Sequence, residues 1–209
     1  MTEPRSWDTL GATEPEAFER LLDGACCPAP GAALLAIAGE FRPVDAARTS
    51  FRLDELARSL FAVAAERDSG AAARELATLL TDEVRLRRDE SSLEGLWLDR
   101  ALERRAGHPL AISVLAAEIG RRAGLSVGIC STAWGWYAGI GEPERLWLID
   151  PATDPGPTPT GPVRAHCGHE VAFAALTGVY ARLVRDGDAA GAHHAVRLRG
   201  RLPVTRHGS

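Results

Sequence analysis

The chain of 209 residues contains no lysine, and its 24 basic side chains are all arginine, set against 28 acidic ones. The formal net charge is −4, and the arginines are interleaved with Asp and Glu along the chain. Proteins that bind nucleic acid or an anionic membrane surface usually carry a basic excess or a basic stripe. The charge balance therefore argues against nucleic acid and membrane as partners, while the heavy use of Arg, Ala and Gly favours a GC-rich bacterial source.

Cysteine and long hydrophobic runs are also scarce. The cysteines are Cys26, Cys27, Cys130 and Cys167, and none of them forms a CxxC pair. Without a disulfide or metal spacing, they are expected to be thiols of a reducing compartment. No apolar run approaches the roughly 20 residues that span a bilayer, and the opening MTEPRSWDTL lacks a signal-peptide core. The expected location is the cytoplasm.

Hydrophobic periodicity divides the chain into helices, then strands, then helices again. This order predicts an α+β fold in three parts, a helical N-terminal region (1–90), a core (91–165) and a C-terminal helical hairpin (166–209). A proline-rich loop is expected at 151–162. Helices are predicted at about 13–22, 31–40, 53–67, 71–86, 92–105, 109–122, 170–185 and 189–201, and strands at 125–132, 134–140 and 146–149.

The segment 98–125 is the predicted centre of this fold. Gly107 can end one helix by taking a positive φ, and Pro109 favours the first turn of the next. Apolar residues recur along 109–122 at helical spacing, so one face of that helix is expected to be buried. Beyond Gly124 the apolar period becomes that of a strand. A buried helix that leads into a sheet is therefore predicted.

The chain resembles the SirB-type transglutaminase-like proteins, a bacterial branch of the transglutaminase and papain-like superfamily. The core likeness lies in the pattern Leu-Asp-x-x-Leu-x-x-Arg-x-Gly-x-Pro, a buried helix, and strands that end in Ile149-Asp150-Pro151. The segments EAFERLL, ALLAIAGEFRPVDAA and LDELA resemble the helical N-terminal domain of that family. The last helices resemble its tetratricopeptide-like hairpin. The resemblance implies a central helix on a short antiparallel sheet.

The resemblance implies a catalytic triad. Its members are a thiol at the start of the central helix, a histidine on the second strand and an aspartate on the third. A thiol is mostly protonated at neutral pH and needs an imidazole or a helix terminus to ionise it. In this chain, segment 109–113 (PLAIS) contains no cysteine, and Trp136 aligns with the family's histidine. Asp150 alone is kept, and an orienting carboxylate by itself moves no proton.

Three other residues could take part in a rebuilt site. Cys130 lies on the first predicted strand, although a buried cysteine more often acts as a small apolar side chain. His108 lies at the hinge before the central helix and is either a half-exposed polar residue or a surrogate base. Ser113 could be a nucleophile served by His108, but its hydroxyl is expected to bond back to a helix carbonyl.

The aromatic side chains have two interpretations, and a group of arginines has one. Trp134, Trp136, Tyr137 and Trp147 either fill the core or line a shallow binding groove. Ser113 is included with the first three of these as a candidate binding set. The arginines at 104, 105, 121 and 122 are interpreted as a solvated face paired with Glu103 and Glu118.

A cluster of His166, Cys167 and His169 lies beside the proline-rich loop. Zinc sites usually draw a second ligand pair from elsewhere, and the remaining histidine pair, 193–194, offers little. Capping of the following helix is the preferred interpretation. No metal and no cofactor are therefore expected.

Two functional hypotheses follow. In the first, the chain is a transglutaminase-like pseudoenzyme that acts as a protein-interaction or regulatory module. In the second, it is an enzyme with a rebuilt cleft that uses Asp150 with His108 or Cys130 on a small metabolite in a biosynthetic pathway. The missing thiol and imidazole favour the first, with another protein or a small molecule as partner.

Overall fold

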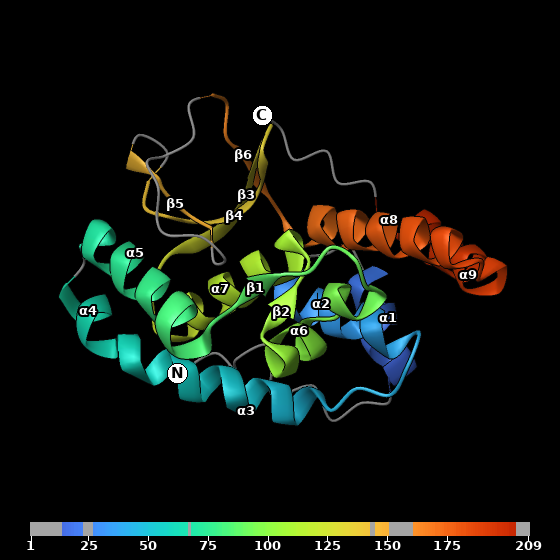
Figure 1. The fold of residues 1–209 in the computed structure, drawn as a ribbon, viewed down its shortest axis with the longest axis horizontal. Helices are drawn as coiled ribbons and strands as arrows, with labels where there is room; N and C mark the ends of the chain where they lie inside the picture. The colour runs from blue at the N-terminus through green and yellow to red at the C-terminus, as the bar shows by residue number, and fades with distance from the viewer. Residues whose placement is uncertain (1–13, 23–26, 67, 143–144, 151–160, 204–209) are drawn as a thin grey trace. The chain divides into compact units, whose positions relative to one another are not determined.

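The structure is a computed structural model that describes residues 14–22, 27–66, 68–142, 145–150 and 161–203 (Figure 1). Two compact units make up the chain. The helical unit comprises residues 1–47 and 167–209, and the core unit comprises residues 48–166. Helices and a four-stranded antiparallel sheet are both present, which confirms the predicted α+β class. The three-part division at 90 and 165 stays a prediction.

The helical unit contains four described helices. The predicted C-terminal hairpin is confirmed, because the last two helices pack against each other. Gly187 has φ 78° at the end of the first, and the Asp188 carboxylate accepts a hydrogen bond from the Gly191 N–H at 2.9 Å to begin the second. The helices are α1 (Glu14–Leu22), α2 (Pro30–Gly39), α8 (Gly168–Asp186) and α9 (Ala189–Arg201).

Helices of the core unit are shorter and more interrupted than the sequence predicts. The helix expected at 53–67 begins earlier and is divided by a 3₁₀ turn, and the one at 71–86 ends as a π-helix. The helix expected at 92–105 is a 3₁₀ turn followed by a short α-helix. The segments are α3 (Ala46–Ala57), η1 (Arg58–Leu60), α4 (Phe61–Glu66), α5 (Ser69–Thr78), η2 (Leu79–Val84), η3 (Leu93–Leu96), α6 (Leu98–Arg104) and α7 (Pro109–Arg122).

Helix α7 is the buried centre of the core unit, as predicted. Every residue from 109 to 120 is buried, so the helix has apolar neighbours on all sides. At its C-terminal end, Gly120 lies so close to the sheet that an added Cβ would be 2.6 Å from Val127 Cγ2. Gly124, with φ +92°, turns the chain into the first strand of the sheet.

The arginines that close α7 do not lie on one solvated face. Arg121 pairs with Glu118 at 3.5 Å, as predicted. The Arg122 side chain is 7% exposed and pairs with Asp54 of α3 at 2.6 Å. The interpretation as a solvated face is therefore wrong for Arg122, because α3 packs over it.

The sheet has the strand order β5-β4-β3-β6, and all neighbours are antiparallel. Val127 of β3 faces α7, so Ile129 two residues on faces it as well, while Cys130 faces the other side. That second side carries a small apolar cluster of Cys130, Tyr137 and Leu148. The strands are β3 (Val127–Thr132), β4 (Gly135–Ile140), β5 (Trp147–Ile149) and β6 (Arg164–His166), and a separate parallel pair is formed by β1 (Arg87–Arg88) and β2 (Ala106–Gly107).

Most of the predicted proline-rich loop, residues 151–160, lies outside the described residues. Within the described parts of the chain, no helix combines the length and the apolar character needed to cross a membrane.

Candidate functional site

The first turn of α7 is where the resemblance places a nucleophile. From the sequence, His108, just before it, is either a half-exposed polar residue or a surrogate base. His108 is the N-cap of α7, and its Nδ1 accepts a hydrogen bond from the Leu110 N–H at 3.2 Å. Burial lowers the pKa of His108, so the neutral ring is favoured at pH 7. With Nδ1 accepting, the proton of the neutral ring lies on Nε2. His108 therefore cannot accept a proton without breaking the helix cap.

Ser113 lies in the second turn of α7 and is fully buried. Its Oγ has no hydrogen-bond partner, so the bond expected to a helix carbonyl is not formed. A buried hydroxyl without a partner carries a desolvation cost of about 1–3 kcal/mol. The side chain is enclosed by the core and presents no surface to a ligand in this conformation.

Cys130 is the one cysteine of the core unit, and it lies on the side of the sheet away from α7. It is 4% exposed and opposes Tyr137 across the β3–β4 ladder. Burial raises the pKa of its thiol, which disfavours the thiolate that would attack an acyl group. The structure thus does not bring Cys130 to the helix end where His108 lies.

Asp150 follows β5, and Arg88 of β1 donates a hydrogen bond to its carboxylate. The Asp150 side chain is 15% exposed. A guanidinium holds a carboxylate in position through a charge-assisted hydrogen bond. This arrangement suits an anchoring role for Asp150 between β1 and β5.

A serine–histidine pair that the sequence did not predict lies at the end of the sheet. Ser131 Oγ on β3 is 2.7 Å from His166 Nε2 on β6, and the Trp136 ring lies with its centroid 4.7 Å from that of His166. Strand β6 was not predicted, because its three residues follow a proline-rich segment. His166 was noticed only as part of a possible metal cluster. A hydroxyl within hydrogen-bond reach of an imidazole is the minimum arrangement for nucleophilic catalysis.

The four aromatic candidates do not form one surface. Trp134 is 75% exposed at the β3–β4 turn and Trp147 is 41% exposed on β5. Trp136 and Tyr137 are neighbours on β4 and therefore point to opposite faces of the sheet. Trp136 contacts His166, while Tyr137 is in the buried cluster with Cys130. A single groove lined by all four is not present in the described part of the chain.

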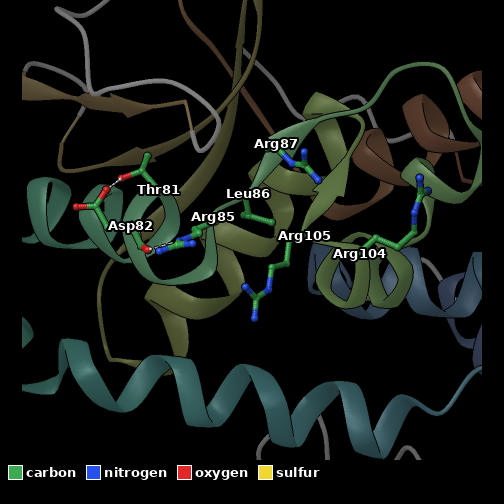
Figure 2. A pocket seen from close by; sticks show the side chains of 7 residues that line it. All are labelled: Thr81, Asp82, Arg85, Leu86, Arg87, Arg104 and Arg105. Carbon is green, nitrogen blue, oxygen red and sulfur yellow. Dashed lines mark hydrogen bonds between the residues drawn. The ribbon is translucent and has the colours of Figure 1, made fainter.

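One hollow of the core unit is lined by arginines (Figure 2). Its volume is about 690 Å³. The arginines come from the end of η2, from β1 and from the end of α6, so three segments contribute to one basic surface. We call this site the arginine hollow, and its lining residues are Thr81, Asp82, Arg85, Leu86, Arg87, Arg104 and Arg105.

Three of these arginines have no carboxylate to neutralise them. Among the described residues, the side chains of Arg85, Arg87 and Arg105 form no ion pair, and Arg85 Nε donates only to the Asp82 carbonyl at 3.3 Å. Figure 2 shows the Asp82 carboxylate turned to the hydroxyl of Thr81, which donates to it at 3.0 Å. The hollow is thus a positive region on a chain of net negative charge, and it suits a carboxylate or phosphate ligand.

Two lining residues have backbone conformations that favour glycine. Arg85 has φ 59° and Arg105 has φ 55°, and each is the C-cap of the helix before it. A side chain in this left-handed region costs roughly 1–2 kcal/mol per residue, which glycine avoids. Strained backbone conformations of this kind often lie at functional sites, and so do π-helical turns such as η2.

Arg104 is held in place by Asp89. Its guanidinium donates to the Asp89 carboxylate at 2.9 Å and to Ser92 Oγ at 3.0 Å. Hydrogen bonds from Ser91 and Ser92 hold the pKa of Asp89 well below its usual range, and Arg104 adds to the effect. The Arg104 side chain is therefore held in one position at the edge of the hollow. The solvated pairing predicted for it with Glu103 is wrong, because Asp89 takes that role.

Comparison with known protein families identifies the family of the core unit. The sequence profile of the Transglutaminase-like superfamily matches residues 47–156. The chain belongs to the transglutaminase-like superfamily. No curated protein and no solved structure matches.

The transglutaminase-like match covers most of the core unit. It begins within α3 and includes the central helix α7, strands β3 to β5 and Asp150. The arginine hollow lies inside the matched range, whereas β6, with His166, lies beyond it. The matched range also includes α4, α5 and η2.

Proposed function

We propose that this transglutaminase-like protein is a non-catalytic interaction module that binds an acidic segment of a partner protein in the arginine hollow. The observation that carries the proposal is the set of three guanidinium groups around one hollow that have no carboxylate partner among the described residues. The finer assignment to the SirB type, with its helical N-terminal domain and tetratricopeptide-like hairpin, belongs to the same proposal. It is supported by the order of helices, strands and helices.

The absence of a workable triad supports a non-catalytic role. The first turns of α7 present buried apolar side chains and Ser113 where the resemblance expects a thiol. Trp136 stands on β4 where it expects an imidazole, and its ring lies against His166. A thiol enzyme needs both groups, because the base generates the thiolate that attacks.

The chemistry of arginine supports an acidic peptide as ligand. A guanidinium donates two parallel hydrogen bonds to one carboxylate, so several arginines around a hollow recognise a run of Glu or Asp side chains. A long polyanion such as nucleic acid is disfavoured by the net charge of −4 that the whole chain carries. A short acidic segment needs only the hollow itself.

The proposal predicts that Arg87→Glu and Arg105→Glu each weaken acidic-peptide binding. The probe is a fluorescein-labelled peptide of alternating Glu and Ser, followed by fluorescence anisotropy with the full chain at low salt. Each reversal removes a charge-assisted bond of about 1.5–3 kcal/mol, so affinity should fall at least about tenfold. Binding should also weaken as salt rises, because exposed charges are screened.

Arg197→Glu is the matched control. Arg197 is an exposed arginine of α9 in the helical unit, so the reversal changes the net charge equally but leaves the hollow intact. Its affinity for the peptide should stay within about twofold of the parent chain. Equal losses in all three variants would mean that the peptide senses only net charge, and the arginine hollow would then not be its site.

An enzyme with a rebuilt cleft is the second candidate, and the Ser131–His166 pair is the observation that favours it. The version that uses Asp150 with His108 or Cys130 is less well supported, because His108 Nδ1 caps α7 and burial raises the pKa of Cys130. A fluorophosphonate that labels Ser131, and fails to do so after His166→Ala, would favour this candidate over the binding module.

A further inference from the structure

In the helical unit, a cysteine near the start of the chain lies beside a cysteine and a histidine near its end. Cys27 precedes α2, Cys167 is the N-cap of α8, and His169 lies in the first turn of α8. One ligand atom from each, the two Sγ atoms and a ring nitrogen, lie within 4.8 Å of one another. No metal site is predicted here from the sequence, because Cys27 lies far along the chain from Cys167 and His169.

The backbone is shaped to bring these groups together. Gly168, between Cys167 and His169, touches the segment that follows Cys27 so closely that an added Cβ would lie 1.9 Å from the Pro28 carbonyl oxygen. No other residue type fits that contact. The start of α8 is also fixed by the Glu170 carboxylate, which accepts a hydrogen bond from the Cys167 N–H at 3.0 Å. The two cysteines are thus held side by side by rigid backbone.

His169 supplies an independent sign that a ligand belongs here. The side chain is 2% exposed, and its Nε2 lies 3.0 Å from the Leu21 carbonyl oxygen. A carbonyl only accepts, so Nε2 donates, and in the neutral ring Nδ1 keeps a lone pair. That Nδ1 is buried and has no hydrogen-bond partner. An imidazole that donates one N–H to a backbone carbonyl and keeps the other nitrogen bare has the tautomer of a metal ligand.

We propose that Cys27, Cys167 and Nδ1 of His169 bind one zinc ion. Two thiolates and an imidazole form a set of ligands that favours zinc over magnesium or calcium, which prefer oxygen. Two thiolate charges balance the charge of Zn²⁺, so the site is neutral overall. In a tetrahedral site with zinc–ligand distances of about 2.0–2.3 Å, the ligand atoms lie roughly 3.5–4 Å apart. The observed cluster reaches that spacing with shifts of about 1 Å.

An ion can reach the three ligands from solvent. Cys27 is exposed, Cys167 is partly exposed and His169 is buried, so the site opens to solvent on the Cys27 side. Three protein ligands leave the fourth position to a water molecule or an external ligand. The ion would tie the segment before α2 to the start of α8. This zinc site is independent of the arginine hollow, which belongs to the core unit.

Cobalt titration of the whole chain tests the proposal. The chain is purified under argon, reduced, stripped of metal and titrated with Co²⁺, whose thiolate charge-transfer band reports bound sulfur directly. One cobalt ion per chain is expected, with a band that disappears when Zn²⁺ is added. Competition with a chromophoric chelator then gives the zinc affinity.

Cys27→Ser is the decisive variant, because Cys27 is exposed and serine is close to cysteine in size. It should weaken the charge-transfer band and reduce zinc affinity at least about tenfold, and His169→Gln should reduce affinity without removing thiolate bands. Cys130→Ala, which removes a cysteine of the core unit, should change neither. No band in the parent chain, an unchanged band in Cys27→Ser, or a Cys27–Cys167 disulfide in place of bound metal would each overturn the zinc site.

Discussion

Replacement of Gly168 by alanine should lower the free energy of unfolding by about 3 kcal/mol, the upper end of what overpacking usually costs. The new Cβ would lie 1.9 Å from the Pro28 carbonyl oxygen and 2.9 Å from its carbon. Both partners are backbone, so no side chain can rotate away. Either α8 or the segment before α2 has to move, and the loss should be seen as a lower urea midpoint by far-UV circular dichroism.

Gly200→Ala in α9 is the control for that experiment. No atom lies within 4 Å of a Cβ added at Gly200, and its φ is not positive. Alanine there should raise helix stability by roughly 0.5–1 kcal/mol, because glycine is the poorer helix former. If Gly168→Ala proved as stable as Gly200→Ala, the close approach of α8 to Pro28 would be wrong, and with it the frame of the zinc site.

Arg85→Gly and Arg105→Gly should change stability and binding in opposite directions. Each residue has positive φ, so glycine relieves strain of roughly 1–2 kcal/mol. Part of this gain is offset by the greater backbone entropy of glycine in the unfolded chain, which leaves a net gain of about 0.5 kcal/mol or more. Each change also removes a guanidinium from the arginine hollow, so acidic-peptide affinity should fall about tenfold. Urea unfolding and fluorescence anisotropy on the same samples measure the two effects.

Arg87→Gly provides the contrast. It removes a charge from the same hollow, but Arg87 lies in strand β1, where glycine weakens the strand. Both stability and affinity should therefore fall. If Arg85→Gly and Arg105→Gly were destabilised as Arg87→Gly is, the left-handed caps would not be strained. If all three bound the peptide normally, the hollow would not be the binding site.

Local signals in the sequence were sufficient for the central elements. The helical apolar period, Pro109 and Gly124 predict α7 almost to the residue, because caps and buried faces act within a few positions. Alternation predicts β3, while an aromatic, glycine-rich run predicts β4 and a short apolar run predicts β5. Strand β6 has no such signal, since its three residues become a strand only by pairing with β3.

The candidate sites could not be predicted from the sequence, because their residues come together only in the folded chain. The arginine hollow combines exposed residues of η2, β1 and α6, which no period or motif links. The cysteine–histidine cluster joins Cys27 to Cys167 and His169, which lie 140 or more residues further along the chain. A helix that ends at an arginine rather than a glycine, as at Arg85 and Arg105, is the one local sign that could have pointed to the hollow.

The rate at which iodoacetamide alkylates Cys130 most directly tests the claim that this transglutaminase-like core has no activated thiol. The full chain is treated at neutral pH, folded and in urea, and alkylation at Cys130 is followed by mass spectrometry. Because the thiol is 4% exposed and burial raises its pKa, the folded chain should react at least about tenfold more slowly than the unfolded one. Faster alkylation of Cys130 in the folded chain would reveal an activated nucleophile and contradict the non-catalytic account.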